Sequence, residues 1–200
     1  MLVSERFTDP KSIGMLQTSF HEHYPCRHCA MDDFLEDDVL QDLQLPELVQ
    51  EITSAQMIER WERIVNEHEY GRLIHVPKDP VLTVQAVGQP LITNGLERYG
   101  TLWKRMRLVV FLDDWDPDDG GFLELFHVEP NADPVLRYHV PPKRGRMVFF
   151  ETHPFVYVGA SPVATGKRYR ALSLSFYTHE TPEWYMAGGV ETRMERPEDE

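Results

Sequence analysis

The sequence predicts an α+β fold, with helices in the first third of the chain and a β-sandwich or barrel after them. Helix-like patterns occur before residue 71, whereas short apolar runs separated by turn residues fill residues 72–180. Helices followed by about eight short strands are typical of a sheet body covered by helices. We therefore expect a single domain, with a helical part at 1–71, a β core at 72–180 and an acidic tail at 181–200.

The strongest helix pattern begins at residue 54. Thr53 or Ser54 is a typical N-cap, and Gly71 is a typical stop. Apolar residues then recur at helical spacing on one face, at Met57, Ile58, Trp61, Ile64 and Val65. A weaker helical pattern, at residues 34–43, follows Asp32 and Asp33. We expect these helices to cover one face of a sheet.

The stretch at residues 105–125 reads as strand, turn and strand. Residues 106–112 are an apolar run long enough for one buried strand, and residues 113–121 have the Asp, Pro and Gly content of a tight loop. Gly120 and Gly121 allow positive φ angles or a close backbone approach. Period-two patterns predict further strands at 74–76, 81–87, 91–93, 122–126, 135–140, 146–150, 155–158 and 169–178.

Composition excludes several classes of protein. The 200 residues carry a formal net charge of −13, which disfavours binding to nucleic acid or to an anionic membrane. No apolar run approaches the roughly 18 residues of a membrane span, and the first residues do not resemble a secretory signal. Two cysteines favour a reducing compartment, so we expect a cytoplasmic protein. A homo-oligomer or a partner enzyme stays possible.

Cys26 and Cys29 have the CxxC spacing of half a zinc site, and His21 and His23 lie close by. These are the only cysteines, so the second half of such a site is missing. A strand at about residues 27–32 is the simpler interpretation, and metal binding stays the alternative.

Several segments together resemble the iron(II)/2-oxoglutarate-dependent oxygenases, in the prolyl-4-hydroxylase-like branch. The matching segments are residues 30–35, 108–125, 140–150 and 170–178. The resemblance implies a double-stranded β-helix, or jelly roll, with flanking N-terminal helices. The strand pattern agrees with that fold.

The resemblance also implies an iron site made of a His-x-Asp/Glu pair and a distal His. The matching positions hold Asn94, Leu96 and Val158, and no His-x-Asp or His-x-Glu occurs between residues 72 and 107. We therefore expect that the metal-binding triad is lost and that no cofactor is used. Iron(II) and 2-oxoglutarate are expected only if this register is wrong. A site relocated to His127, His139 or His153 is the remaining alternative.

The resemblance matches Arg170, or less well Arg168, to the arginine that pairs with 2-oxoglutarate. A pocket for a small molecule is then expected at Asn94, Tyr99, Trp103, Arg107 and Arg170, because jelly rolls commonly hold ligands between their walls. Tyr157 and His139 are the candidates for acid–base catalysis, together with His153 or Glu124. The structural alternative is that Arg170 anchors a carboxylate such as Glu124 or Glu151, and that Trp103 is core.

Three functions follow from these observations. The first is acid–base chemistry on a small molecule, of the cyclase or isomerase type and without a metal. The second is an inactive relative of the oxygenases that binds a ligand or a partner enzyme. The third is an iron(II)/2-oxoglutarate hydroxylase with relocated metal ligands.

Overall fold

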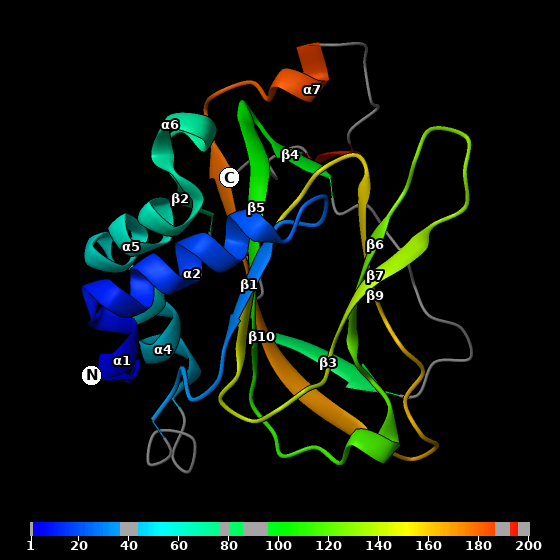
Figure 1. The fold of residues 1–200 in the computed structure, drawn as a ribbon. Coiled ribbons are helices and arrows are strands. Elements are labelled where there is room, and N and C mark those ends of the chain that lie inside the picture. Colours follow the sequence, from blue (N-terminus) through cyan, green and yellow to red (C-terminus); the bar gives the residue numbers. More distant parts are fainter. Residues whose placement is uncertain (1, 37–43, 77–80, 86–95, 187–192, 196–200) are drawn as a thin grey trace.

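The computed structural model describes residues 2–36, 44–76, 81–85, 96–186 and 193–195. Figure 1 shows three layers: a group of helices, a large sheet beside them, and a small sheet on the other side of the large one. This arrangement confirms the expected α+β fold with a jelly-roll body. The expected strand at 91–93 and most of the weaker helical pattern lie outside the described residues.

The helices begin where the sequence offers capping side chains. Ser54 Oγ accepts a hydrogen bond from Met57 N at 3.4 Å, as the N-cap pattern predicts. Asn66, with a φ of 67°, ends that helix, so Gly71 is not its stop. The described helices are α1 (Glu5–Thr8), α2 (Pro10–Glu22), α4 (Leu45–Ile52), α5 (Ala55–Val65), α6 (Glu67–Tyr70) and α7 (Glu183–Met186).

Helix α2 was not predicted from the sequence. Its start carries two clear signals, because Pro10 is the first helical residue and the Asp9 side chain accepts from Ser12 N at 3.1 Å. Its apolar positions are sparse, with Ile13, Leu16 and Phe20 buried. The hydrophobic period alone was therefore too weak to identify it.

The large sheet follows the strand order β1-β8-β5-β10-β2, with β3 on β10 and β4 on β5. Part of the expected tail joins it, because β11 (Arg193–Glu195) pairs with β4 in parallel. The other strands of this sheet are β1 (His28–Met31), β2 (Ile74–His75), β3 (Val81–Gln85), β4 (Glu97–Tyr99), β5 (Leu102–Phe111), β8 (Met147–Glu151) and β10 (Arg168–Thr178).

The small sheet has the order β7-β6-β9 and closes the other side of the jelly roll. Its strands are β6 (Leu123–His127), β7 (Val135–Val140) and β9 (Val156–Ala160). Strand ends differ from the predicted ones by a few residues at most, except that β5 begins four residues earlier. That extension matters, because it places residues 103–105 inside the sheet.

Two apolar cores lie on the two faces of the large sheet. The helix-side core joins α2 and α5 to the sheet and includes Phe20, Trp61, Leu108, Phe149 and Leu174. The barrel core fills the space between the two sheets and includes Val109, Leu125, Val148, Phe150, Val158 and Ala171. Alternation along each strand sends neighbouring residues to opposite cores. Cys26 belongs to the barrel core and Cys29 to the helix-side core, so the two thiols do not face one site.

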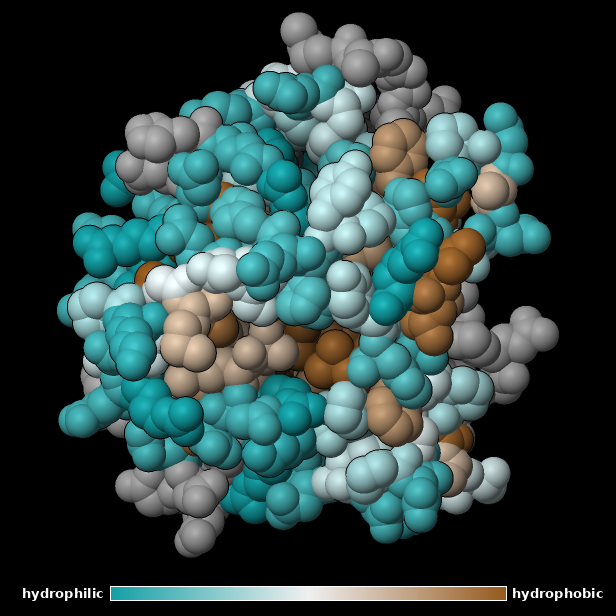
Figure 2. All heavy atoms as spheres, viewed as in Figure 1, coloured by the Kyte–Doolittle hydropathy of each residue, from teal (hydrophilic) through white to brown (hydrophobic). Residues whose placement is uncertain are grey.

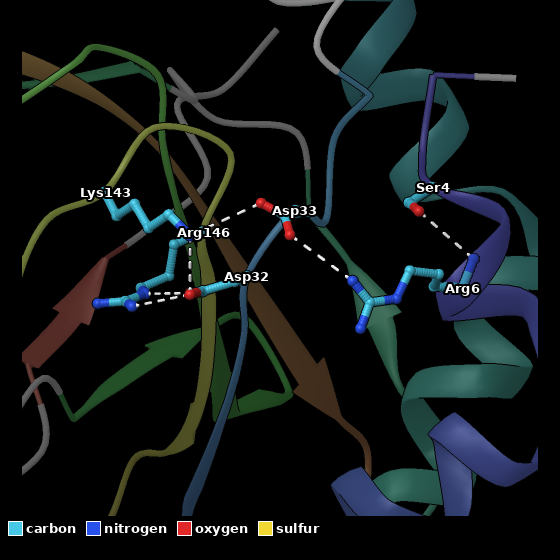
Figure 3. A network of polar contacts seen from close by, with 6 residues as sticks. All are labelled: Ser4, Arg6, Asp32, Asp33, Lys143 and Arg146. Carbon is cyan, nitrogen blue, oxygen red and sulfur yellow. Dashed lines mark hydrogen bonds and ion pairs between the residues drawn. The ribbon is translucent and has the colours of Figure 1, made fainter.

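Figure 3 shows a polar network that joins β1 to the turn before β8 and to α1. The Asp32 carboxylate accepts from Arg146 Nε at 2.5 Å and Nη2 at 3.1 Å, and from Lys143 Nζ at 2.9 Å. Asp33 lies 3.6 Å from Arg6 and 3.7 Å from Lys143. The guanidinium of Arg146 lowers the pKa of Asp32 to about 2.

The face of the molecule in Figure 2 is mostly hydrophilic, and its hydrophobic side chains gather in small patches. Strand β7 contributes two exposed apolar side chains, Val135 and Leu136. Within the described residues, no helix has the length and the apolar character needed to cross a membrane.

Candidate binding pocket at the end of the large sheet

A polar pocket of about 390 Å³ lies where β5 begins and β8 and β10 end. In Figure 1 this region is the upper end of the sheet, between α6 and α7. We call it the Arg105 pocket. It is lined by Glu69, Arg105, Glu151, His153, Glu180, Thr181, Pro182, Glu183 and Trp184.

A β-bulge turns Arg105 into this pocket. Phe176 of β10 pairs with Met106 and Tyr177 pairs with Lys104, so Arg105 has no partner residue on β10. A bulged residue leaves the regular alternation, and its side chain can point in a new direction. The guanidinium of Arg105 lies 4.8 Å from the centre of the Tyr70 ring, a cation–π contact.

Arg105 is a buried cation with an unsatisfied donor. It is 6% exposed, and its Nε has no hydrogen-bond partner among the described residues. Burial lowers the pKa of Arg105, while the nearby Glu151 raises it. A buried donor without a partner is destabilising unless another group, such as a ligand or a water, satisfies it.

Glu151 is 7% exposed, and this burial raises its pKa to about 7. The charges of Arg105 and Arg27 oppose that rise, as does the Tyr70 hydroxyl group. A carboxyl group with this pKa exchanges its proton near neutral pH, which is the property of a general acid or base. Glu151 was named from the sequence only as a possible structural partner of Arg170.

His153 stands beside these two residues in its neutral form. Burial lowers the pKa of His153 to about 4, and the charges of Arg105 and Arg27 add to the effect. Its Nδ1 accepts from Phe155 N at 3.3 Å, so the ring proton sits on Nε2. His153 can therefore donate one hydrogen bond from Nε2.

The sequence-predicted pocket residues separate into two groups in the structure. Tyr99, Trp103 and Arg107 lie at the same end of the large sheet, on β4 and β5. Arg107 Nε donates to Ser173 Oγ at 2.8 Å. The centre of the Trp103 ring lies 4.4 Å from that of Tyr185 and 6.2 Å from that of Trp184. Arg170 instead lies exposed and pairs with Asp113, with Nη2 to Oδ1 at 2.6 Å. Asn94 lies outside the described residues.

His139 and Tyr157 lie on the small sheet, away from the Arg105 pocket. His139 Nε2 is 3.7 Å from Glu124 Oε1, and the centre of the His139 ring lies 4.0 Å from that of the Phe122 ring. Tyr157 pairs with Phe126 and alternates with the buried Val156 and Val158. The structure therefore does not bring these two residues together with Arg107 or Arg170.

The interior of the jelly roll is hydrocarbon where the family resemblance would place iron. Val158 is 7% exposed within the barrel core, and Leu96 is 6% exposed. Neither side chain has a lone pair to offer a metal. Across the described part of the chain, no three His, Cys, Asp or Glu side chains form a group that could hold a metal ion.

Comparison with known families gives one match, over part of the chain. The family model described as the 2OG-Fe(II) oxygenase superfamily, where 2OG is 2-oxoglutarate, matches residues 93–179. These residues are therefore similar to the 2OG-Fe(II) oxygenase superfamily. The match confirms the resemblance that the sequence motifs indicated. No curated protein matches the chain in sequence.

Solved structures of the oxygenase superfamily share the fold at low sequence identity. A prolyl-4-hydroxylase from Pseudomonas putida is 18% identical with a TM-score of 0.50, covering 82% of this chain and 91% of that one. A Phytophthora capsici prolyl 4-hydroxylase is 14% identical with a TM-score of 0.56, and the alignment covers 92% of this chain and 71% of that one. The epimerase SnoN from nogalamycin biosynthesis is 11% identical with a TM-score of 0.53, covering 84% of each chain.

The prediction that no cofactor is used is wrong in the light of these comparisons. The matched superfamily is named for Fe(II) and 2OG, and prolyl hydroxylases share the fold. Fe(II) and 2OG are therefore the cofactors that the family implies. The side chains at Leu96 and Val158 do not fit an iron ion, so the family's ligand set is not repeated at these two positions.

One spacing of chemical interest was missed from the sequence. His127-Val128-Glu129 is a His-x-Glu sequence at the end of β6. The charge of His127 makes a small contribution to the lowered pKa of His153. Sequence spacing alone could have found the His127 and Glu129 pair, but not its neighbour.

Proposed function

We propose that this oxygenase-fold protein binds an anionic small molecule in the Arg105 pocket and performs acid–base chemistry on it. The observation that carries the proposal is the buried Arg105, whose Nε lacks a partner at the wall of a 390 Å³ pocket. A carboxylate or phosphate group of a ligand would satisfy this donor with a charge-assisted hydrogen bond.

Each residue of the pocket has a distinct role in this proposal. Arg105 binds the anionic group, and the Tyr70 ring fixes the guanidinium from one face. Glu151 takes a proton from one carbon of the substrate and returns it to another, so the reaction is an isomerisation that conserves atoms and charge. His153 Nε2–H donates a hydrogen bond to a substrate oxygen.

The binding step is tested by calorimetry with 2-oxoglutarate, pentanoate and inorganic phosphate as probes. We expect at least one of these anions to bind the wild-type protein and to bind Arg105→Gln at least tenfold more weakly, because a bidentate cation is lost. Arg6→Gln is the matched control, since Arg6 is an exposed arginine far from the pocket. Arg105→Lys keeps the charge if the glutamine variant does not fold.

Two results would overturn the proposal. One is that none of the probes binds the wild-type protein. The other is that the Arg105 variants bind the probes as tightly as the wild type does.

A second candidate function, oxygenation with Fe(II) and 2OG, is favoured by the family match over residues 93–179. Its test uses protein purified without chelator. One equivalent of bound iron together with succinate release from 2OG would establish it. A His127→Ala variant that loses this iron would place the metal at the His-x-Glu sequence of β6.

A further inference from the structure

The charges around the Arg105 pocket are arranged from floor to rim. The buried Arg105 and Glu151 form the floor, while Glu180 and Glu183 line the pocket from exposed positions. Both of these acids lie in or next to α7, after the end of β10. The pocket therefore offers a cation at depth and carboxylates at its entrance.

The rim carboxylates differ in how they are compensated. Glu69, another acid of the lining, forms an ion pair with Arg27. Among the described residues, neither Glu180 nor Glu183 forms an ion pair with a cation. Glu180 is nevertheless close enough to Arg105 for its charge to raise the pKa of that guanidinium, so a simple anion on Arg105 would also be repelled by this carboxylate.

Trp184 adds a second unsatisfied donor to the same lining. Its Nε1 is buried and has no hydrogen-bond partner within the described residues. The centre of the Trp184 ring lies 6.2 Å from that of Trp103 and 6.1 Å from that of His153. These contacts hold the Trp184 ring at the pocket wall. Arg105 on β5 and Trp184 on α7 thus each bring a donor without a partner to the lining of the same pocket.

We propose that the ligand of this pocket is a small bipolar molecule, with a carboxylate or phosphate at one end and an organic ammonium group at the other. The anionic end lies on Arg105 and Trp184, and the ammonium end lies between Glu180 and Glu183. This inference rests on the proposed function, because it uses the same anion site at Arg105. The inference specifies the class of ligand, which Arg105 and Glu151 at the floor of the pocket do not define by themselves.

A matched series of probes separates the two proposals. The series consists of 5-aminopentanoate, pentanoate, glutarate and pentylamine, which share a five-carbon chain and differ only in their end groups; glycine and 6-aminohexanoate vary the spacing. We expect the best aminocarboxylate to bind about fivefold more tightly than pentanoate, because two exposed acids each contribute a modest attraction. Binding is measured by calorimetry on the full chain at low salt.

The rim is tested by the double variant Glu180→Gln/Glu183→Gln. We expect this variant to bind pentanoate at least as tightly as the wild type and to lose the preference for the aminocarboxylate. The control is Glu47→Gln/Glu59→Gln, which removes the same charge from exposed positions on α4 and α5. Both acids of the test pair are exposed, so removing their charges leaves the buried core unchanged.

The outcomes distinguish the two claims. If pentanoate and glutarate bind at Arg105 as tightly as every aminocarboxylate, the bipolar inference fails and the proposed anion site stands. The inference also fails if the rim variant keeps the preference. If neither a carboxylate nor inorganic phosphate binds the wild-type protein, both proposals fail.

Discussion

At the scale of single residues, Glu151 is the group whose chemistry depends most on burial. Its side chain is 7% exposed at the end of β8, beside Arg105 and Tyr70. Since burial disfavours the charged carboxylate, the pKa of Glu151 rises to about 7 instead of falling beside two arginines. The same shift has a consequence for the stability of the fold.

We predict that Glu151 makes the protein less stable as pH rises. Its pKa of about 7 in the folded protein exceeds the ordinary value of 4.5, so the unfolded chain loses the proton first. Below pH 4.5 Glu151 is protonated in both the folded and the unfolded protein, so it does not lower the stability. Between pH 4.5 and 7 the free energy of unfolding falls, by up to about 3 kcal/mol. Urea denaturation of the wild type and Glu151→Gln at pH 5 and pH 8 checks this.

The glutamine variant should show a smaller loss of stability between those two pH values than the wild type. Glu129→Gln, at an exposed position, serves as the control and should follow the wild type. An equal change in the free energy of unfolding between pH 5 and pH 8 in the wild type and in Glu151→Gln would show that Glu151 titrates at its ordinary pKa.

At the scale of elements, the loop between β5 and β6 depends on its two glycines. Gly120 and Gly121 have φ angles of 75° and 70°, as the turn composition predicted. A Cβ added at Gly120 would lie 2.1 Å from the backbone oxygen of Pro162, and one at Gly121 would lie 2.6 Å from the Tyr169 ring. The glycines thus permit both the turn and the close approach of the loop before β10.

We predict that Gly120→Ala lowers the free energy of unfolding by at least about 2 kcal/mol, because it adds a backbone clash to the strain of a positive φ. The matched control is Gly166→Ala. Gly166 also has a positive φ, of 80°, but nothing lies within 4 Å of the added Cβ. That substitution should cost about 1 kcal/mol. Similar losses in the two variants would contradict the steric argument.

The connection between β1 and β8 gives a second prediction at this scale. Asp32 binds Arg146 and Lys143, and these contacts lower its pKa from 3.8 to about 2. A lowered pKa means that the contribution to stability is present above pH 3.8 and is lost as pH falls through about 2. Because Asp32 is partly exposed, solvent reduces the contribution to roughly 1 kcal/mol.

Asp32→Asn should therefore lower the free energy of unfolding by about that amount at pH 7, and by less at pH 2.5. Chemical denaturation at the two pH values measures the difference. Asp33→Asn is the control at the neighbouring position, since Asp33 lies farther from its partners (Figure 3). If Asp33→Asn lowers the free energy of unfolding as much as Asp32→Asn does, the negative charge of this loop, and not the specific contacts of Asp32, provides the stability.

At the scale of the whole molecule, two separate cores hold the layers together. The helix-side core attaches the helices to the large sheet, and the barrel core attaches the small sheet to its other face. Val158 belongs to the barrel core, at the position that the family resemblance matches to the distal metal ligand. Its packing among Leu125, Val109 and other apolar side chains makes it part of the structural interior.

We predict that Val158→Ala lowers the free energy of unfolding by about 2 kcal/mol, because it opens a cavity in the barrel core. The same substitution should leave anion binding at the Arg105 pocket unchanged. Val135→Ala, at an exposed position of β7, should change the stability by less than about 0.5 kcal/mol. Loss of anion binding in folded Val158→Ala would show instead that the barrel interior takes part in the site.

Local patterns in the sequence were enough to predict the β part of the fold and the resemblance to the oxygenase superfamily. Alternating apolar residues and Gly- or Pro-rich turns marked most strands, because strand period and turn chemistry are local properties. The segment around Gly120 and Gly121 carried the resemblance for the same reason. Helix α2 escaped prediction because the packing of its few apolar residues against the sheet, and not a strong hydrophobic period, holds it in place.

The position of the pocket, in contrast, depends on how distant segments pack together. Glu69, Arg105, Glu151 and Glu180 come from four distant segments and share no motif. A β-bulge turns Arg105 away from its regular face, and burial shifts the pKa of Glu151 to about 7. Both effects arise from the surroundings of a residue in space, and for that reason the order of residues along the chain did not reveal them.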